Sequence, residues 1–460
     1  MILIGRPSLR GIFADKDHLA FALIMIELSL VGLLISLIIF PDEAIKCMIW
    51  NGNTHGYFPD FSETLYASNN LDPYSVGSVY PPLVYLALYP ISLLIPGISE
   101  RATSESLILF SIFVVIIIFF FVPTFRLFWR QMEIEKRQKI IIILFLFSSA
   151  PMIYCIERGN LVFVGWLLIA AFVFLYDSED VRKRHLSIFI LALSLNIKPY
   201  LGLFALTFLL DKRYKDLALL LLYSSILFIV PMMFVGGIPE ISSLVSNMLN
   251  LEAINSEDVS DFGFGYKVGL TNTIGIIVAL LEANLGIIIS KSTIDLTLII
   301  LKICFGTGFL YTAVKSDSWW ERVLAILLIY VLLTSISWIY NAIYMSIPLI
   351  LLLNEKENKG VFVCTILIVL SLVSLPYGYA ITGLSGGNQV SYSSFVSSMS
   401  LVILSCVLIY LNLKKGFSKH FGTDSGELGI RKSSNEEDKY WVRRGEDGNK
   451  TRSCGFFNED

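Results

Sequence analysis

Long apolar runs constrain the fold of this chain more than any other feature of its sequence. The first run, from Leu19 to Phe40, has 22 residues, of which only Glu27 is charged. A helix needs about 20 predominantly apolar residues to cross a bilayer. The run is too long for the apolar region of a signal peptide, and no small-x-small cleavage site follows it. It therefore predicts a retained first transmembrane helix.

Ten further apolar runs follow, at about 105–125, 139–156, 160–176, 186–210, 217–235, 270–290, 293–314, 322–353, 360–382 and 393–413. Together they predict an all-α polytopic membrane protein with about 11 spanning or half-spanning segments over residues 18–413. Charged residues make up 16% of the chain, against about 25% in soluble domains. This excludes a soluble multidomain enzyme and a disordered protein. No clustered basic face suggests nucleic acid as a partner, so the expected environment is a lipid bilayer.

The distribution of Lys and Arg orients the predicted helices, because cytoplasmic loops carry more of both. Loop 126–139 holds five cations and loop 177–185 holds three. Loops 41–104 and 236–268 are acidic and read as external. We expect a multi-pass protein of the plasma membrane with both termini in the cytoplasm, residues 1–17 forming the N-terminus. Residues 414–460 are polar and are expected to form a disordered tail.

Three apolar runs do not fit one straight span each. The run 186–210 is basic at both ends and contains Lys198-Pro199, which favours a broken helix or a short hairpin. The run 322–353 is too long and is expected to break near Ser337 to Asn341. The run from Tyr80 to Pro96 is expected to lie on or dip into the outer membrane surface. If it crossed the bilayer, the cationic loop 126–139 would lie outside.

The external loop 41–104 is rich in aromatic residues and prolines and carries the most prominent carboxylates. Asp60 and Glu63 are three residues apart and share one face if the segment is helical. A carboxylate walled by aromatic residues at the membrane surface suits a general base toward a hydroxyl. The alternative is that Asp60 is a helix N-cap and Glu63 its capping-box partner. Asp72, before Pro73, reads as a turn residue.

Three cations beside the apolar runs are candidate anion contacts. Arg158 suits bidentate binding of a phosphate, or a local pair with Glu157. Lys198 faces a phosphate or carboxylate, or reaches from a broken helix to the surface. Lys267 is an anion contact or a solvated loop residue.

Trp338 and Asn341 lie in a polar, aromatic stretch at the expected helix break of 322–353. They are candidate substrate contacts, or they mark the membrane interface, where Trp and Tyr are enriched. The four histidines and six cysteines are scattered without metal-ligand spacing, and the Walker A and H-E-x-x-H motifs are absent. We therefore expect neither a metal site nor a cofactor.

Several motifs resemble, in order, those of the GT-C superfamily of membrane glycosyltransferases, most closely glycosyltransferase family 87, the polyprenyl-phosphate-mannose-dependent mannosyltransferases. The resemblance covers residues 18–413 and is carried by Asp60-Phe61, Asp72-Pro73-Tyr74, Tyr80-Pro81-Pro82-Leu83, Arg158-Gly159-Asn160, Asn196-Ile197-Lys198-Pro199-Tyr200 and Ser337-Trp338. It implies a GT-C-like helix bundle whose long first external loop carries juxtamembrane helices.

The resemblance also implies a function: transfer of a hexose, mannose in the family, from a polyprenyl-phosphate sugar donor to a hydroxyl of a lipid-linked or glycan acceptor. Asp60 is then the catalytic base of an inverting reaction at the outer membrane face. Substrate-binding residues are expected at Glu63, Tyr80, Arg158, Asn160, Lys198, Lys267, Trp338 and Asn341.

The chain departs from the family pattern at one place. Family members often carry histidine after the late Ser-Trp, where this chain has Tyr340 and Asn341. A histidine contact to the donor or acceptor therefore does not carry over to this chain. The alternative is a non-enzymatic membrane protein: a lipid-linked saccharide transporter or flippase, or an inactive GT-C scaffold.

Overall fold

The computed structural model describes residues 17–48, 58–95, 106–257, 266–334, 337–356, 358–376, 379–381 and 390–421. The chain divides into two compact units, Met1–Gly416 and Phe417–Asp460. The first unit holds every element except the end of the last helix. The expected N-terminal segment up to residue 16 and the expected tail beyond residue 421 lie outside the described residues.

The first half of the chain contains α1 (Asp17–Ile39), α2 (Pro41–Met48), α3 (Pro59–Ser68), α4 (Pro82–Ser92), α5 (Ser106–Gln131), α6 (Lys136–Ser148), α7 (Ala150–Arg158), α8 (Val162–Leu175), α9 (Val181–Leu195), η2 (Pro199–Phe204), α10 (Ala205–Leu210) and α11 (Tyr214–Phe234). The second half contains α12 (Glu240–Glu257), α13 (Leu270–Leu285), α14 (Lys291–Lys315), α15 (Trp319–Leu333), η4 (Ile339–Met345), α16 (Ser346–Leu352), α17 (Lys359–Leu372), β1 (Tyr379–Ile381), β2 (Val390–Ser391) and α18 (Tyr392–Phe421). Strands β1 and β2 pair as a short antiparallel ribbon, and the other elements of the described chain are helices, as the sequence predicted.

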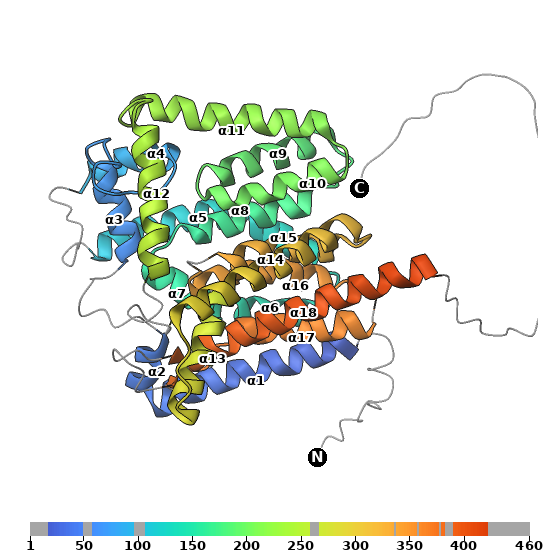
Figure 1. Cartoon of the computed structure of the whole chain (residues 1–460). Helices are drawn as coiled ribbons and strands as arrows, with labels where there is room; N and C mark the ends of the chain where they lie inside the picture. Colours follow the sequence, from blue (N-terminus) through green and yellow to red (C-terminus); the bar gives the residue numbers. More distant parts are fainter. Residues whose placement is uncertain are drawn as a thin grey trace, which may run out of the picture. The chain divides into compact units, whose positions relative to one another are not determined.

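Five helices of the described chain are long and apolar enough to cross a membrane: α1, α5, α11, α14 and α18. The pair α6 and α7, bent by 52°, counts as a sixth if the two helices form one broken span rather than a re-entrant loop. Large apolar side chains on these helices face outward, with Ile38 70% and Phe119 74% exposed. Such surfaces are stable against lipid tails and not against water. The described residues thus form an α-helical, multi-pass membrane protein (Figure 1). Many of the other expected segments are shorter apolar helices.

Both expected helix breaks are confirmed. Helix α9 ends at Leu195 and η2 begins at Pro199, with Lys198 in extended conformation as the position before proline favours. The Asn196 side chain donates to the carbonyl oxygens of Ala192 in α9 and Ser224 in α11, which ties the end of α9 to α11.

The second break separates α15, which ends at Leu333, from η4, which begins at Ile339. It contains no proline. The Ser337 carbonyl instead accepts the Val268 N–H at 2.7 Å. A neighbouring strand-like segment thus replaces the helical hydrogen bonds at this point.

Helices α3 and α4, from the long segment between α1 and α5, lie with α12 at one end of the bundle (Figure 1). Helix α4 has 11 residues, which gives a length of about 17 Å and is too short to cross a bilayer. It packs against α3 and α11. Figure 1 shows α12 running across the direction of α11, at the same end as α3 and α4. The Asn247 side chain of α12 donates to the Tyr74 and Ser78 carbonyls of the α3–α4 connection.

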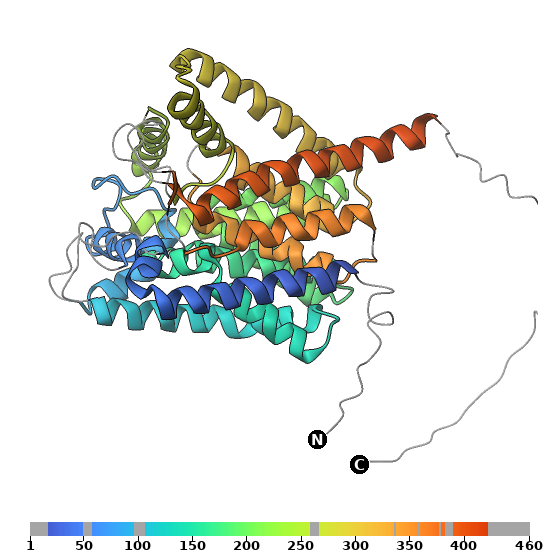
Figure 2. The same ribbon diagram turned by 90° about the horizontal axis from the view of Figure 1, so that it is seen from below.

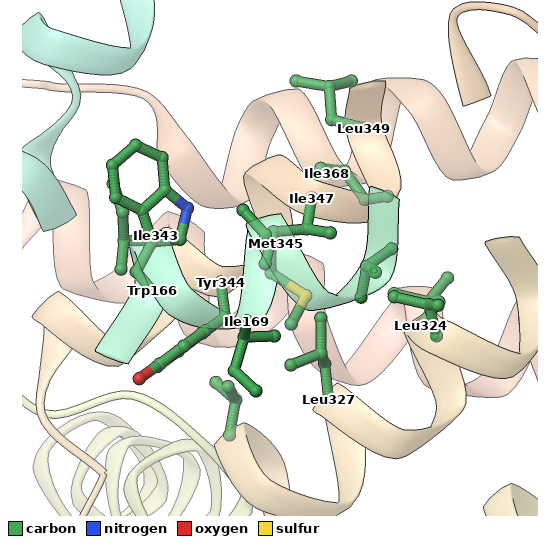
Figure 3. Close-up of a cluster of buried hydrophobic side chains, with 14 of the residues drawn as sticks. Trp166, Ile169, Leu324, Leu327, Ile343, Tyr344, Met345, Ile347, Leu349 and Ile368 are labelled. Carbon is green, nitrogen blue, oxygen red and sulfur yellow. The ribbon is translucent and has the colours of Figure 1, made fainter. Parts of the chain in front are cut away.

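A dense apolar core connects the middle of the bundle. Figure 3 shows Trp166 of α8 and Leu324 of α15 around Met345 of η4, with Ile368 of α17 nearby. The Trp166 indole N–H donates to the Ser346 hydroxyl at 2.8 Å, which satisfies a polar group inside this core. Around it, Figure 2 shows α1, α17 and α18 running in roughly the same direction along one side. The core therefore holds the two broken segments in fixed positions.

Gly269 is the residue at which we expect the largest local cost of a small substitution. Its φ is 105° and its ψ −177°, a region essentially reserved for glycine. A Cβ there would lie 2.9 Å from the Val331 carbonyl oxygen. We expect Gly269→Ala to lower the free energy of unfolding by about 3 kcal/mol or more.

The matched control is Gly286→Ala. Gly286 also has positive φ, 65°, but no atom lies within 4 Å of the added Cβ. It should cost only about 1 kcal/mol. Thermal unfolding of the two variants in detergent compares them, and equal losses would contradict the close packing of Gly269 against α15.

Candidate functional site

Asp60 lies in the first turn of α3, at the end of the bundle that holds α3, α4 and α12 (Figure 1). The chain enters α3 through Phe58, which has φ 54° and is the N-cap residue without a side-chain cap bond. The capping alternative for Asp60 and Glu63 is therefore wrong. Phe61 and Leu65 are fully buried, and Phe61 contacts Phe113 of α5 at 5.3 Å between ring centroids. Burial of this apolar face fixes the orientation of α3.

The turn Arg158-Gly159-Asn160 holds the Asp60 carboxylate. The Arg158 Nε donates to Asp60 Oδ1 at 2.9 Å, and its Nη2 donates to the same oxygen. The Asn160 Nδ2 donates to Asp60 Oδ2. Asn160 Oδ1 in turn accepts the Val162 N–H at 2.8 Å. Both carboxylate oxygens thus have fixed donors. Oδ1 accepts two hydrogen bonds, whereas Oδ2 accepts one and keeps a lone pair for a further hydrogen bond.

The sequence offered a local pair of Arg158 with Glu157, and this alternative is wrong. Arg158 reaches Asp60, while Glu157 Oε2 has no hydrogen-bond partner among the described residues. Adjacent residues on a helix do not face each other, which is the physical reason. Gly159, at φ 63°, ends α7 and lets the turn approach α3 so closely that a Cβ would lie 2.8 Å from Phe61 Cβ.

The contact between Arg158 and Asp60 gives a stability prediction that is independent of function. Arg158→Gln removes the guanidinium group and leaves the Asp60 carboxylate, whose side chain is only 14% exposed, without its cationic partner. The double-mutant cycle with Asp60→Asn should give a coupling energy of about 1–3 kcal/mol. Chemical or thermal unfolding of the four proteins measures it. A coupling indistinguishable from zero would show that the pair does not hold the turn to α3.

A cation and a phenol form the second part of the site. The Lys198 Nζ donates to the Tyr80 hydroxyl at 3.0 Å and lies 4.2 Å from the centroid of its ring. The Tyr80 N–H donates to the Tyr85 hydroxyl, which ties the segment before α4 in place. Burial, and next the negative charge of Asp60, raise the pKa of Tyr80 well above its usual range. The phenol stays neutral and keeps its hydrogen for an acceptor in the cavity.

Two cations lie near the Trp338 ring. The Lys267 Nζ is 5.7 Å and the Arg158 Cζ 5.9 Å from the centroid of a Trp338 ring, distances at which a cation is attracted to the ring face. Lys267 pairs with Trp338 in a β-bridge and is only 9% exposed. The alternative that Lys267 is a solvated loop residue is therefore wrong.

A cavity of about 770 Å³ joins these groups. Seven of the nine residues predicted from the sequence line it: Asp60, Glu63, Tyr80, Asn160, Lys198, Trp338 and Asn341. Arg158 and Lys267 are not in the lining. They contact Asp60 and Trp338 respectively, so they act on the cavity through those residues. The volume is in the range of pockets that take a small-molecule ligand.

Sequence reasoning missed several lining residues as site residues, among them Tyr85, Met248 and Tyr330. The Tyr330 ring stacks on Tyr200 at 3.7 Å between centroids. Tyr330 belongs to α15, whose sequence is almost uniformly apolar. The pattern of apolar and polar residues therefore did not distinguish Tyr330 from its neighbours. Tyr200, the stacking partner of Tyr330, directly follows Lys198-Pro199. This proximity to Lys198 is the signal in the sequence that could have indicated Tyr200 as a lining residue. Asp72 does not line the cavity.

The residues that line the cavity can carry out acid–base and anion-binding chemistry side by side. Asp60 is a proton acceptor with a fixed direction, and Lys198 with Tyr80 offers hydrogen-bond donors to a negative group. No protein-family model matches the chain, and no curated protein matches it at a significant level. The functional argument therefore rests on the residues and their geometry.

Proposed function

We propose that the protein transfers a hexose from a polyprenyl-phosphate donor to a hydroxyl of a glycolipid or glycan acceptor. The observation that carries the proposal is the pairing of an oriented carboxylate, Asp60, and an ammonium group, Lys198, in one cavity. The helices that build this cavity sit at one end of a membrane bundle. A water-soluble acceptor group and a membrane-anchored donor can both reach such a place.

The transfer reaction can proceed with Asp60 as the base and with Lys198 and Tyr80 as donors to the leaving phosphate. Asp60 accepts the proton of the acceptor hydroxyl, whose oxygen forms a bond to C1 of the hexose. The bond between C1 and the phosphate oxygen breaks, and its electron pair leaves with the polyprenyl phosphate. Lys198 and the Tyr80 hydroxyl donate to the phosphate as its negative charge grows. A single displacement of this kind inverts the configuration at C1.

Three features favour a lipid-linked donor over a nucleotide sugar. Val76, Val79 and Met248 give part of the cavity an apolar lining, which suits a polyprenyl chain. The surrounding helices expose apolar side chains of the kind that faces lipid. The sequence also shows no Gly-rich phosphate-binding loop of the type that cradles nucleotides.

The proposal includes an orientation in the plasma membrane with both termini in the cytoplasm. Cations gather at the helix ends that flank the α5–α6, α8–α9 and α10–α11 connections, such as Lys136 and Arg137 of α6 and Arg182, Lys183 and Arg184 of α9. Figure 1 shows the α10–α11 connection at the end of the bundle opposite α3 and α4. Cation-rich loops stay in the cytoplasm, which puts the cavity on the outer side.

The test uses purified full-length protein in lipid nanodiscs with a membrane glycolipid extract as acceptor. Radiolabelled polyprenyl-phosphate hexoses are supplied one at a time, and nucleotide sugars serve as comparison donors. We expect label to move to the acceptor from a polyprenyl-phosphate hexose only. Transfer from nucleotide sugars alone would contradict the proposal. Failure of every donor with well-folded protein would move the assignment to a transporter, a flippase or an inactive scaffold.

A further inference from the structure

Asn341 is a buried amide with unused hydrogen-bonding capacity beside the cavity. It is 3% exposed and lines the cavity from η4. Its backbone N–H donates to the Trp338 carbonyl at 2.9 Å. Its side-chain Oδ1 is buried and has no hydrogen-bond partner among the described residues. Buried polar atoms normally have partners, so an unpaired one in a cavity wall points to a ligand.

The other amide in the wall shows what a structural role requires. Asn160 uses both ends of its side chain, because Nδ2 donates to Asp60 and Oδ1 accepts from Val162. The hydroxyl of Thr334, also in the lining, donates to the Tyr330 carbonyl at 2.9 Å. Asn341 has no such bond at its carboxamide oxygen, and packing needs alone do not explain an amide at this position.

The geometry of a displacement places the sugar between the two charged parts of the site. The attacking oxygen, C1 and the leaving oxygen lie roughly in line, so the base and the phosphate contacts stand on opposite sides of the hexose. The remaining hydroxyls of the ring then point to the side walls. A carboxamide both donates and accepts, which suits a neutral hydroxyl and gives no advantage to a phosphate.

We infer that Asn341 binds a hydroxyl of the donor hexose and is a specificity-determining residue for the sugar. This inference rests on the proposed function and assigns one wall of the same cavity to the hexose rather than to the phosphate. A site that hydrogen-bonds a substrate hydroxyl discriminates against sugars that lack it or present it in another direction, because its amide is then left unpaired.

The experiment measures equilibrium binding of two lipids to the purified protein in nanodiscs: a polyprenyl-phosphate hexose and the same polyprenyl phosphate without sugar. Asn341→Leu keeps the size of the side chain and removes its hydrogen bonds. We expect the variant to bind the hexose-bearing lipid about tenfold more weakly. Its affinity for the sugar-free lipid should change less than twofold. The ratio of its affinities for lipids that carry epimeric hexoses should move closer to one than in the wild type.

The matched control is Thr334→Val, which removes a hydroxyl from the same lining that is already bonded to Tyr330. It should leave binding of both lipids unchanged. Unchanged binding of the hexose-bearing lipid by Asn341→Leu would overturn the inference and leave the proposed function intact. An equal loss for both lipids would also overturn it, because Asn341 would then shape the cavity without reading the sugar. Failure of the wild type to bind either lipid would instead overturn the proposed function and, with it, the inference.

Discussion

Replacing Asp60 by asparagine is expected to lower the rate of hexose transfer by about 10²–10⁴-fold, the usual contribution of a general base. Asparagine has nearly the same shape but cannot accept the proton of the acceptor hydroxyl. Its carbonyl oxygen can still accept from Arg158, so the turn at Gly159 keeps a contact with α3. Initial rates with labelled donor, at saturating acceptor, measure the effect.

The control for this variant is Asp72→Asn. Asp72 belongs to the same segment between α1 and α5 but does not line the cavity, so its variant should transfer hexose at the wild-type rate. Equal transfer by wild type and Asp60→Asn would contradict the role of Asp60. Glu63, the other carboxylate in the cavity lining, would then be the next residue to replace.

Removal of the Lys198 ammonium is expected to have the second largest effect. In Lys198→Met a side chain of similar length remains, but the leaving phosphate loses its cationic donor. We expect kcat to fall by about 10²–10³-fold, as when one donor to a developing negative charge is removed. Tyr80→Phe should give a smaller loss, because only one neutral hydroxyl is removed.

Lys215→Met provides the matched control for charge and size. Lys215 is exposed in the first turn of α11, away from the cavity, and its loss should leave transfer unchanged. A Lys198→Met variant that keeps wild-type kcat would show that the phosphate leaves without help from this cation. Another residue of the site would then have to bind the leaving phosphate, and the proposed role of the Tyr80 hydroxyl would have to be revised with it.

The sequence predicted the parts of the fold that depend on local composition. The helical membrane segments followed from apolar runs, and the break at Lys198-Pro199 followed from the steric restriction that proline places on the residue before it. The structure added the bend between α6 and α7, which divides a run that reads as continuous. Ser149 caps α7 there by accepting the Met152 N–H, a local contact that hydropathy does not reveal.

The site was predictable residue by residue, but its pairings were not. Asp60 and Arg158 were both singled out, yet their contact spans 98 positions in sequence. A single sequence carries no information about which distant carboxylate an arginine reaches, so Glu157 looked like the natural partner. Tyr330 was missed for a different reason. An aromatic residue in an apolar helix is ordinarily core, and only the break at Pro199 brings Tyr200 against it.

The anomeric configuration of the transferred hexose tests the central claim most directly. Wild-type protein, a polyprenyl-phosphate hexose of known configuration and a purified acceptor would be allowed one turnover, and NMR would give the configuration of the new glycosidic bond. A single displacement assisted by Asp60 predicts the configuration opposite to that of the donor. A product with retained configuration, or no glycosidic product at all, would contradict the account.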